Sequence, residues 1–178
     1  CRKPHPPRRG ELLWDIGAGA GSVAIEWMLC DASLAAIAIE KRGDRAARIR
    51  RNAAALGVPG LQVIEGAAPG ALAGLPAPSA IFIGGGASEA GVLDTSISVL
   101  KPGGRLVVNA VTLATEKQLL ARHAAVGGAL TRIAIARAQA VATRGYRDLQ
   151  FIEQDVCAPI AQSGNIVIFD CLHYLRPG

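Results

Sequence analysis

The chain has 178 residues, 51% of them hydrophobic, and a formal net charge of +5 at pH 7, which predicts a single domain over residues 1–178 with a sizeable core. Its apolar runs stop well short of the roughly 18 residues of a membrane helix, and its N-terminus has no secretory signal, so a cytoplasmic protein without a membrane partner is predicted. The four cysteines and three histidines form no cluster with ligand spacing, so no metal site is expected. Because the chain starts without Met, we expect it to be a fragment of a longer polypeptide.

Apolar strands alternate with helical segments along the chain. Strands are expected at residues 11–16, 34–39, 61–64, 79–83, 105–110 and 130–136, and helices at 22–29, 42–56, 69–73, 88–100 and 115–125. A final antiparallel strand is expected at 149–152 or at 166–171. Near-continuous Val, Ile and Leu content suits strands that are buried on both faces. The pattern therefore predicts an α/β fold of the doubly wound, Rossmann-like kind, with a mostly parallel, seven-stranded sheet whose last strand is antiparallel.

A glycine-rich turn follows the first strand and is the most informative stretch of the chain. Its alternate glycines would let the backbone press directly against a ligand. The dinucleotide fingerprint would need glycine at position 22, where this chain has Ser22, so a cofactor with a charged amino-acid end is favoured over a pyrophosphate. S-adenosylmethionine is such a molecule. The turn would offer backbone donors to its carboxylate, and Asp15 would place a negative charge near its ammonium and sulfonium groups. The predicted cofactor-binding residues here are Asp15, Gly17, Ala18, Gly19, Ala20 and Gly21.

Three further strand ends are expected to complete the cofactor pocket. Glu40 ends the second strand about twenty residues after the first glycine, where an acidic side chain can accept hydrogen bonds from a ribose diol. Gly66 and Ala67 follow the third strand, and Gly84 and Gly85 follow the fourth. Each feature alone could be a tight turn or a helix cap, but their order along the chain predicts a methyltransferase that uses S-adenosylmethionine.

Four blocks of sequence resemble one known family. They lie at residues 13–17, 65–72, 80–86 and 108–113, and they are similar to the decarboxylating precorrin C15-methyltransferases of cobalamin biosynthesis. These are class I methyltransferases that form the C-terminal half of precorrin-6Y methylases, often behind a C5-methylating domain. The resemblance implies methyl transfer from S-adenosylmethionine to C15 of a precorrin tetrapyrrole, decarboxylation of the C12 acetate and a homotetramer. Ala67 departs from the family, which often has Asp there.

The tetrapyrrole implied by the resemblance carries many carboxylates, so cationic partners are expected. Arg105, Arg144 and Arg147 are candidates by position, whereas the arginines of the 42–56 helix are expected on a solvated exterior. Asn109, at the end of the fifth strand, could orient the acceptor, or could simply form a turn or a cap. We name no catalytic residue, because positioning and desolvation could supply most of the rate.

Two other functions are compatible with the sequence. A tRNA methyltransferase of the adenine-N1 type has a similar catalytic domain and would use the basic charge on phosphates. Such an enzyme ordinarily carries an additional RNA-binding domain, and none is visible, so no nucleic-acid partner is expected. Alternatively, the domain could bind its cofactor without turnover because an N-terminal segment is missing.

Overall fold

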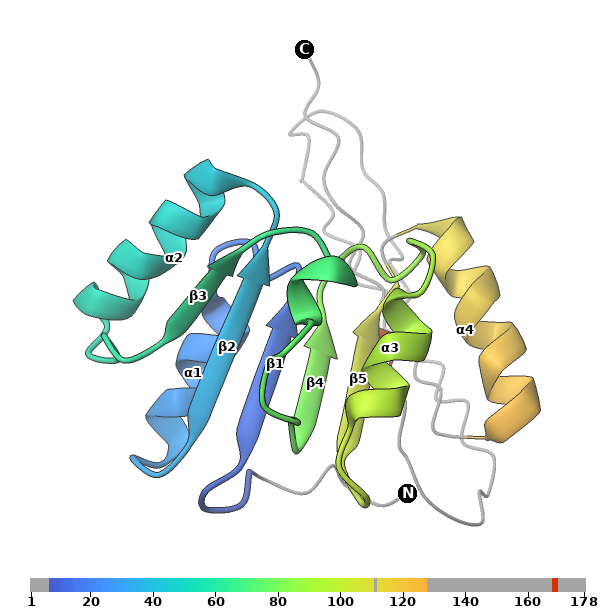
Figure 1. The fold of residues 1–178 in the computed structure, drawn as a ribbon, viewed down its shortest axis with the longest axis horizontal. Coiled ribbons are helices and arrows are strands. Elements are labelled where there is room, and N and C mark those ends of the chain that lie inside the picture. The colour runs from blue at the N-terminus through green and yellow to red at the C-terminus, as the bar shows by residue number, and fades with distance from the viewer. Residues whose placement is uncertain (1–6, 111, 128–167, 170–178) are drawn as a thin grey trace, which may run out of the picture.

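The computed structural model describes residues 7–110, 112–127 and 168–169 (Figure 1). Strands and helices alternate through this part of the chain. In chain order the elements are β1 (Leu12–Ile16), α1 (Ser22–Cys30), β2 (Ala35–Glu40), α2 (Gly43–Ala55), β3 (Gln62–Glu65), the short 3-10 helix η1 (Gly70–Leu72), β4 (Ala80–Ile83), α3 (Val92–Val99), β5 (Arg105–Asn109), α4 (Leu113–Val126) and β6 (Ile168–Phe169).

The strands form one sheet in the order β3-β2-β1-β4-β5-β6, and every neighbouring pair is parallel. The chain therefore starts near the middle of the sheet, runs to one edge, and returns to build the other half. The carboxyl ends of β1 and β4 lie side by side where the direction of winding changes, and Ile16 is in register with Ile83. This is the position at which open α/β sheets bind their ligands.

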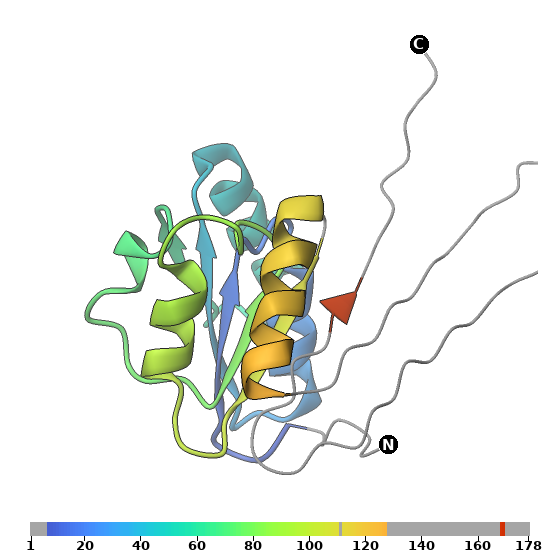
Figure 2. The ribbon, with the colours of Figure 1, turned by 90° about the vertical axis from the view of Figure 1, so that its right-hand side faces the viewer.

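Two apolar cores cover the two faces of the sheet. Trp14, Ile81 and Val108 belong to a core that also contains Leu93 of α3 and Leu119 of α4. The other core joins strand residues of the opposite face to α1 and α2, through residues such as Leu13, Ala38, Ile25 and Ile49. Figure 2 shows the sheet edge-on, with α3 on one side and α1 on the other. The doubly wound α/β fold predicted from the sequence is thereby confirmed.

The expected elements are found within a few residues of their predicted bounds as far as β5. The largest shift is at α3, which was expected to start at residue 88 and begins at Val92. Gly86 and Gly91 both have φ of 80°, a conformation that interrupts a helix and that glycine adopts without strain. Among the described residues, no helix is both long enough and apolar enough to cross a membrane.

The antiparallel pairing expected at 166–171 is wrong for the part that the structure describes. Ile168 and Phe169 pair in parallel with Val108 and Asn109 of β5. A strand's apolar content does not reveal its direction, which depends on the connection that precedes it. The predicted strands at 130–136 and 149–152 lie outside the described residues, and the described sheet has six strands where seven were expected.

The structure places Arg105, a candidate for binding substrate carboxylates, at the edge of the sheet opposite the carboxyl ends of the strands. Arg105 starts β5, opposite Ala80, and so lies at the amino edge of the sheet. Its guanidinium forms an ion pair with Glu11 in which both side chains are largely buried, and it stacks over Trp27 at 5.6 Å from the ring centroid. These contacts hold the start of β5 against the start of β1, far from the edge where ligands bind. Arg144 and Arg147 lie outside the described residues.

Candidate functional site

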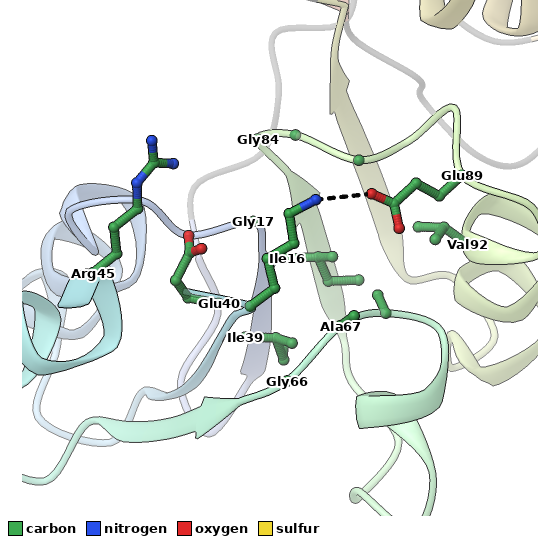
Figure 3. Close-up of a pocket in the computed structure, with 14 residues that line it drawn as sticks. Ile16, Gly17, Ile39, Glu40, Arg45, Gly66, Ala67, Gly84, Glu89 and Val92 are labelled. Carbon is green, nitrogen blue, oxygen red and sulfur yellow. Dashed lines mark hydrogen bonds and ion pairs between the residues drawn. The ribbon is translucent and has the colours of Figure 1, made fainter. Parts of the chain in front are cut away.

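A cleft of about 310 Å³ opens at the carboxyl edge of the sheet, where β1, β2, β3 and β4 end. Its walls combine backbone from glycine-rich loops with a few apolar and charged side chains (Figure 3). The lining residues are Ile16, Gly17, Ile39, Glu40, Lys41, Arg45, Gly66, Ala67, Ala68, Gly84, Gly85, Gly86, Glu89 and Val92.

The turn after β1 and the loop after β4 touch through their backbones. Gly17 has φ of 70°, and a Cβ added to it would lie 2.7 Å from the carbonyl oxygen of Gly85 and 2.9 Å from its nitrogen. The amide of Gly17 donates to the carbonyl of Ile39 at 2.9 Å, and that of Gly84 donates to Ile16 at 2.8 Å. Glycine at position 17 is therefore required by both the conformation and the close approach.

The same turn is also held by α2. A Cβ on Gly21 would lie 2.7 Å from Cγ2 of Ile49, a fully buried side chain. The side-chain amide of Asn52 donates to the carbonyl of Ala20 at 2.9 Å. The turn is thus fixed from β4 on one side and from α2 on the other.

Glu40 is a buried carboxylate in the cleft wall, with only 3% of its surface exposed. Its Oε2 accepts a hydrogen bond from the amide of Gly19 at 2.9 Å, and its Oε1 accepts one from the amide of Arg42 at 3.0 Å. These two bonds fix the carboxylate across the end of β2. Each oxygen retains a further lone pair that can accept a hydrogen bond from a ligand hydroxyl.

Asp15 lies behind the cleft and does not line it. Its Oδ2 accepts from the amide of Ala24, the third residue of α1, at 3.1 Å. The helix needs this acceptor because its N-cap, Gly21, offers no side chain. The pKa of Asp15 is raised to about 7, mainly because the carboxyl is buried; the hydrogen bond from Ala24 lowers this pKa in part, and the negative charge of Glu40 adds to the rise. Oδ1 of Asp15 has no hydrogen-bond partner among the described residues.

The structure brings together about half of the predicted cofactor-binding residues. Those that line the cleft are Gly17, Glu40, Gly66, Ala67, Gly84 and Gly85. Asp15, Ala18, Gly19, Ala20 and Gly21 support the turn without lining the cleft. Asn109 ends β5 outside this cleft, with a buried Oδ1 that has no hydrogen-bond partner in the described part of the chain.

Several lining side chains were missed by the sequence interpretation. Lys41 directly follows β2 and Arg45 lies in the first turn of α2, whereas Glu89 and Val92 follow the glycine loop after β4. A residue next to a predicted strand end is a candidate for the same edge, and this signal could have identified Lys41. Arg45 is exposed, as expected for its helix, but it lies at the cleft. Among the described residues, no group of three or more His, Cys, Asp or Glu side chains could hold a metal ion.

Comparison with known proteins identifies relatives that belong to one family of methyltransferases. Residues 5–156 match the family model described as "Precorrin methyltransferase domain". The precorrin-6Y C(5,15)-methyltransferase [decarboxylating] of Sinorhizobium sp is 64% identical over 132 residues, which cover 74% of this chain and 32% of that protein. The cobalt-precorrin-6B C(15)-methyltransferase (decarboxylating) of Salmonella typhimurium is 32% identical over 120 residues, covering 67% of this chain and 62% of that protein. This chain thus spans about a third of the Sinorhizobium protein's length.

A solved structure agrees with these relatives. The C-terminal domain of precorrin-6Y C5,15-methyltransferase from Rhodobacter capsulatus has a TM-score of 0.70 and 50% sequence identity to this chain. The match covers 78% of this chain and 74% of that one. The family resemblance read from the four sequence blocks is confirmed.

The contact between Gly17 and Gly85 can be tested by a matched pair of substitutions. Gly17→Ala and Gly19→Ala both place a Cβ on a residue with positive φ, but a Cβ at Gly19 has no atom within 4 Å. Both variants should lose about 1 kcal/mol through backbone conformation. Gly17→Ala should lose roughly 1 to 3 kcal/mol more, because the loop after β4 must move. Chemical denaturation measures both losses, and equal losses would contradict the contact.

The raised pKa of Asp15 predicts a pH-dependent stability. In the unfolded chain Asp15 has its ordinary pKa of 3.8, whereas in the folded chain it stays protonated up to about pH 7. The stabilisation is therefore complete at low pH and is lost as pH rises through this window. Between pH 5 and pH 8 the free energy of unfolding should fall by roughly 3 kcal/mol relative to Asp15→Asn, which lacks this titration. Denaturant titrations of both proteins across the range provide the measurement, and parallel curves would contradict it.

Proposed function

This chain belongs to the family of precorrin methyltransferase domains, and on that premise we propose that it transfers a methyl group from S-adenosylmethionine to C15 of a precorrin. Decarboxylation of the C12 acetate accompanies the transfer, as a step of cobalamin biosynthesis. The observation that carries the proposal is the cleft at the carboxyl edge, where a buried carboxylate faces a tight glycine turn. The names of relatives from Sinorhizobium and Salmonella support the reaction and its decarboxylating character.

The cleft fits an S-adenosyl cofactor by the chemistry of its walls. Glu40 would accept hydrogen bonds from the ribose hydroxyls, since its carboxylate is already fixed by the amides of Gly19 and Arg42. The turn from Gly17 to Gly21 ends at the N-terminus of α1, where backbone N–H groups favour the cofactor's carboxylate. Gly66, Ala67, Gly84 and Gly85 leave room for the nucleoside.

The proposed reaction requires the chain mainly to bind and orient the two reactants and to exclude water from them. S-adenosylmethionine, when bound, would supply an electrophilic methyl group to the ring carbon of the acceptor. Holding the two reactants in line and away from water can account for much of the rate. We assign the orientation of the acceptor to Asn109, whose buried Oδ1 lacks a partner in the described residues at the end of the neighbouring strand. Arg144 and Arg147 remain candidates for the substrate carboxylates.

Other parts of the proposal follow from the family resemblance. Residues 1–178 would form one methyltransferase domain, which in its relatives is part of a longer chain. We further propose a homotetramer in the cytoplasm, with a tetrapyrrole and no nucleic acid as its substrate.

The role of Glu40 is tested by the affinity for S-adenosylhomocysteine, the demethylated cofactor. Glu40→Ala should weaken binding by roughly 1.5 to 3 kcal/mol, the cost of losing a hydrogen bond to a charged group. Glu65→Ala is the matched control, since Glu65 is in register with Glu40 on the neighbouring strand but lies outside the cleft. Calorimetry should show that Glu65→Ala binds like the unchanged protein. Equal affinity of all three proteins would overturn the assignment of Glu40.

The reaction itself is tested with the full-length protein and methyl-labelled S-adenosylmethionine. We expect label to enter a precorrin intermediate with release of carbon dioxide, and bulk tRNA to stay unlabelled. Salt should weaken binding of the tetrapyrrole only modestly, whereas binding through many phosphates would depend steeply on salt. Label in tRNA and none in the tetrapyrrole would reject the precorrin substrate. Tight cofactor binding without any transfer would instead indicate a binding domain that does not turn over.

A further inference from the structure

An ion pair joins the two walls of the cleft. Nζ of Lys41, the residue after β2, lies 3.2 Å from Oε1 of Glu89 in the loop between β4 and α3. Both side chains line the cleft, and the dashed line in Figure 3 marks their contact. Of the ion pairs formed within the described residues, this is the one whose two members both line the cleft.

The stability of the fold does not explain this pair. The side chains of Lys41 and Glu89 are 64% and 46% exposed, and ion pairs at such exposure contribute about 0 to 1 kcal/mol. Residues 41 and 89 are also far apart in the chain, so the pair is not a local helix contact. A charge pair that contributes little to folding, yet lies in the ligand cleft, points to a role in recognition.

The loop after β4 fixes where Glu89 projects. The amide of Glu89 donates to the carbonyl of Gly86 at 3.0 Å, which closes a turn immediately before α3. A Cβ on Gly86 would lie 3.7 Å from Oε1 of Glu89, so the carboxylate lies close to the glycine loop. Figure 3 places Glu89 and Glu40 on opposite sides of the cleft, with Ile16 and Ile39 between them. The cleft therefore presents a second carboxylate, away from the one assigned to the ribose.

We propose that Glu89 determines specificity for adenine, by accepting a hydrogen bond from the exocyclic amino group of the base. Lys41 is a positioning residue that holds this carboxylate in the cleft. Adenine presents an amino donor beside a ring-nitrogen acceptor, and an ion pair presents the complementary acceptor and donor side by side. Ile16, Ile39 and Val92 line the same space with apolar side chains suited to the faces of a planar ring. The inference rests on the proposed function, because it assumes an S-adenosyl ligand in this cleft.

The test compares two ligands on the full-length protein by calorimetry. One is S-adenosylhomocysteine, and the other is its analogue with unsubstituted purine in place of adenine, which lacks only the amino group. The unchanged protein should bind the adenine compound roughly five- to tenfold more tightly, a modest factor for a charged hydrogen bond because Glu89 is partly exposed. Glu89→Ala should bind both compounds alike, Glu89→Gln should retain part of the preference through its amide oxygen, and Lys41→Met should reduce it.

Two controls separate base recognition from general effects. Asp44→Ala breaks the exposed Arg42–Asp44 pair, which lies beside the cleft but does not line it, and should keep the full preference. Glu40→Ala should weaken the binding of both compounds by the same factor. If Glu89→Ala weakens the binding of both compounds equally and keeps the preference for adenine, the Lys41–Glu89 pair merely closes the cleft. The inference is then overturned. If the unchanged protein binds neither compound, the proposed function fails together with it.

Discussion

The close approach of two backbones determines the shape of the candidate site. The turn after β1 and the loop after β4 meet at Gly17 and Gly85, at a separation that leaves no room for a Cβ on Gly17. This contact is possible because β1 and β4 are neighbours in the sheet although most of the first half of the domain separates them in sequence. The cleft is the space that remains between these two segments and the ends of β2 and β3. A side chain at the contact would push the walls apart and change the cleft.

Burial divides the acidic residues around this contact into different roles. Glu40 faces the cleft and is held by two backbone amides. Asp15 is only one strand away, yet it supports the first turn of α1 and keeps its proton up to about pH 7, because burial raises its pKa. Glu89 is partly exposed and is held by a lysine. Three carboxyl groups in one region therefore differ in burial, in hydrogen-bond partners and in availability to a ligand.

The sequence predicted the strands, their order of appearance and the edge at which the site lies, because these depend on local patterns of apolar residues and glycine. Asp15 does not line the cleft, and the sequence pattern could not show this, because it does not say which face of the strand the cleft borders. Arg105 lies at the amino edge of the sheet, a position that follows from its place as the first residue of a parallel strand. The pair between Lys41 and Glu89 was not predictable, because it depends on how two loops distant in sequence meet in space.

The attachment of the glycine turn to α2 affects how the site would meet a ligand. Ile49 packs under Gly21, and Asn52 binds the carbonyl of Ala20, so this turn is braced by a helix in addition to the sheet. Glycine-rich segments have the most conformational freedom to lose when they become ordered, and here folding has already ordered the turn. Most of the entropic cost of association at this end of the cleft would therefore come from the ligand, so the turn is preorganised for binding.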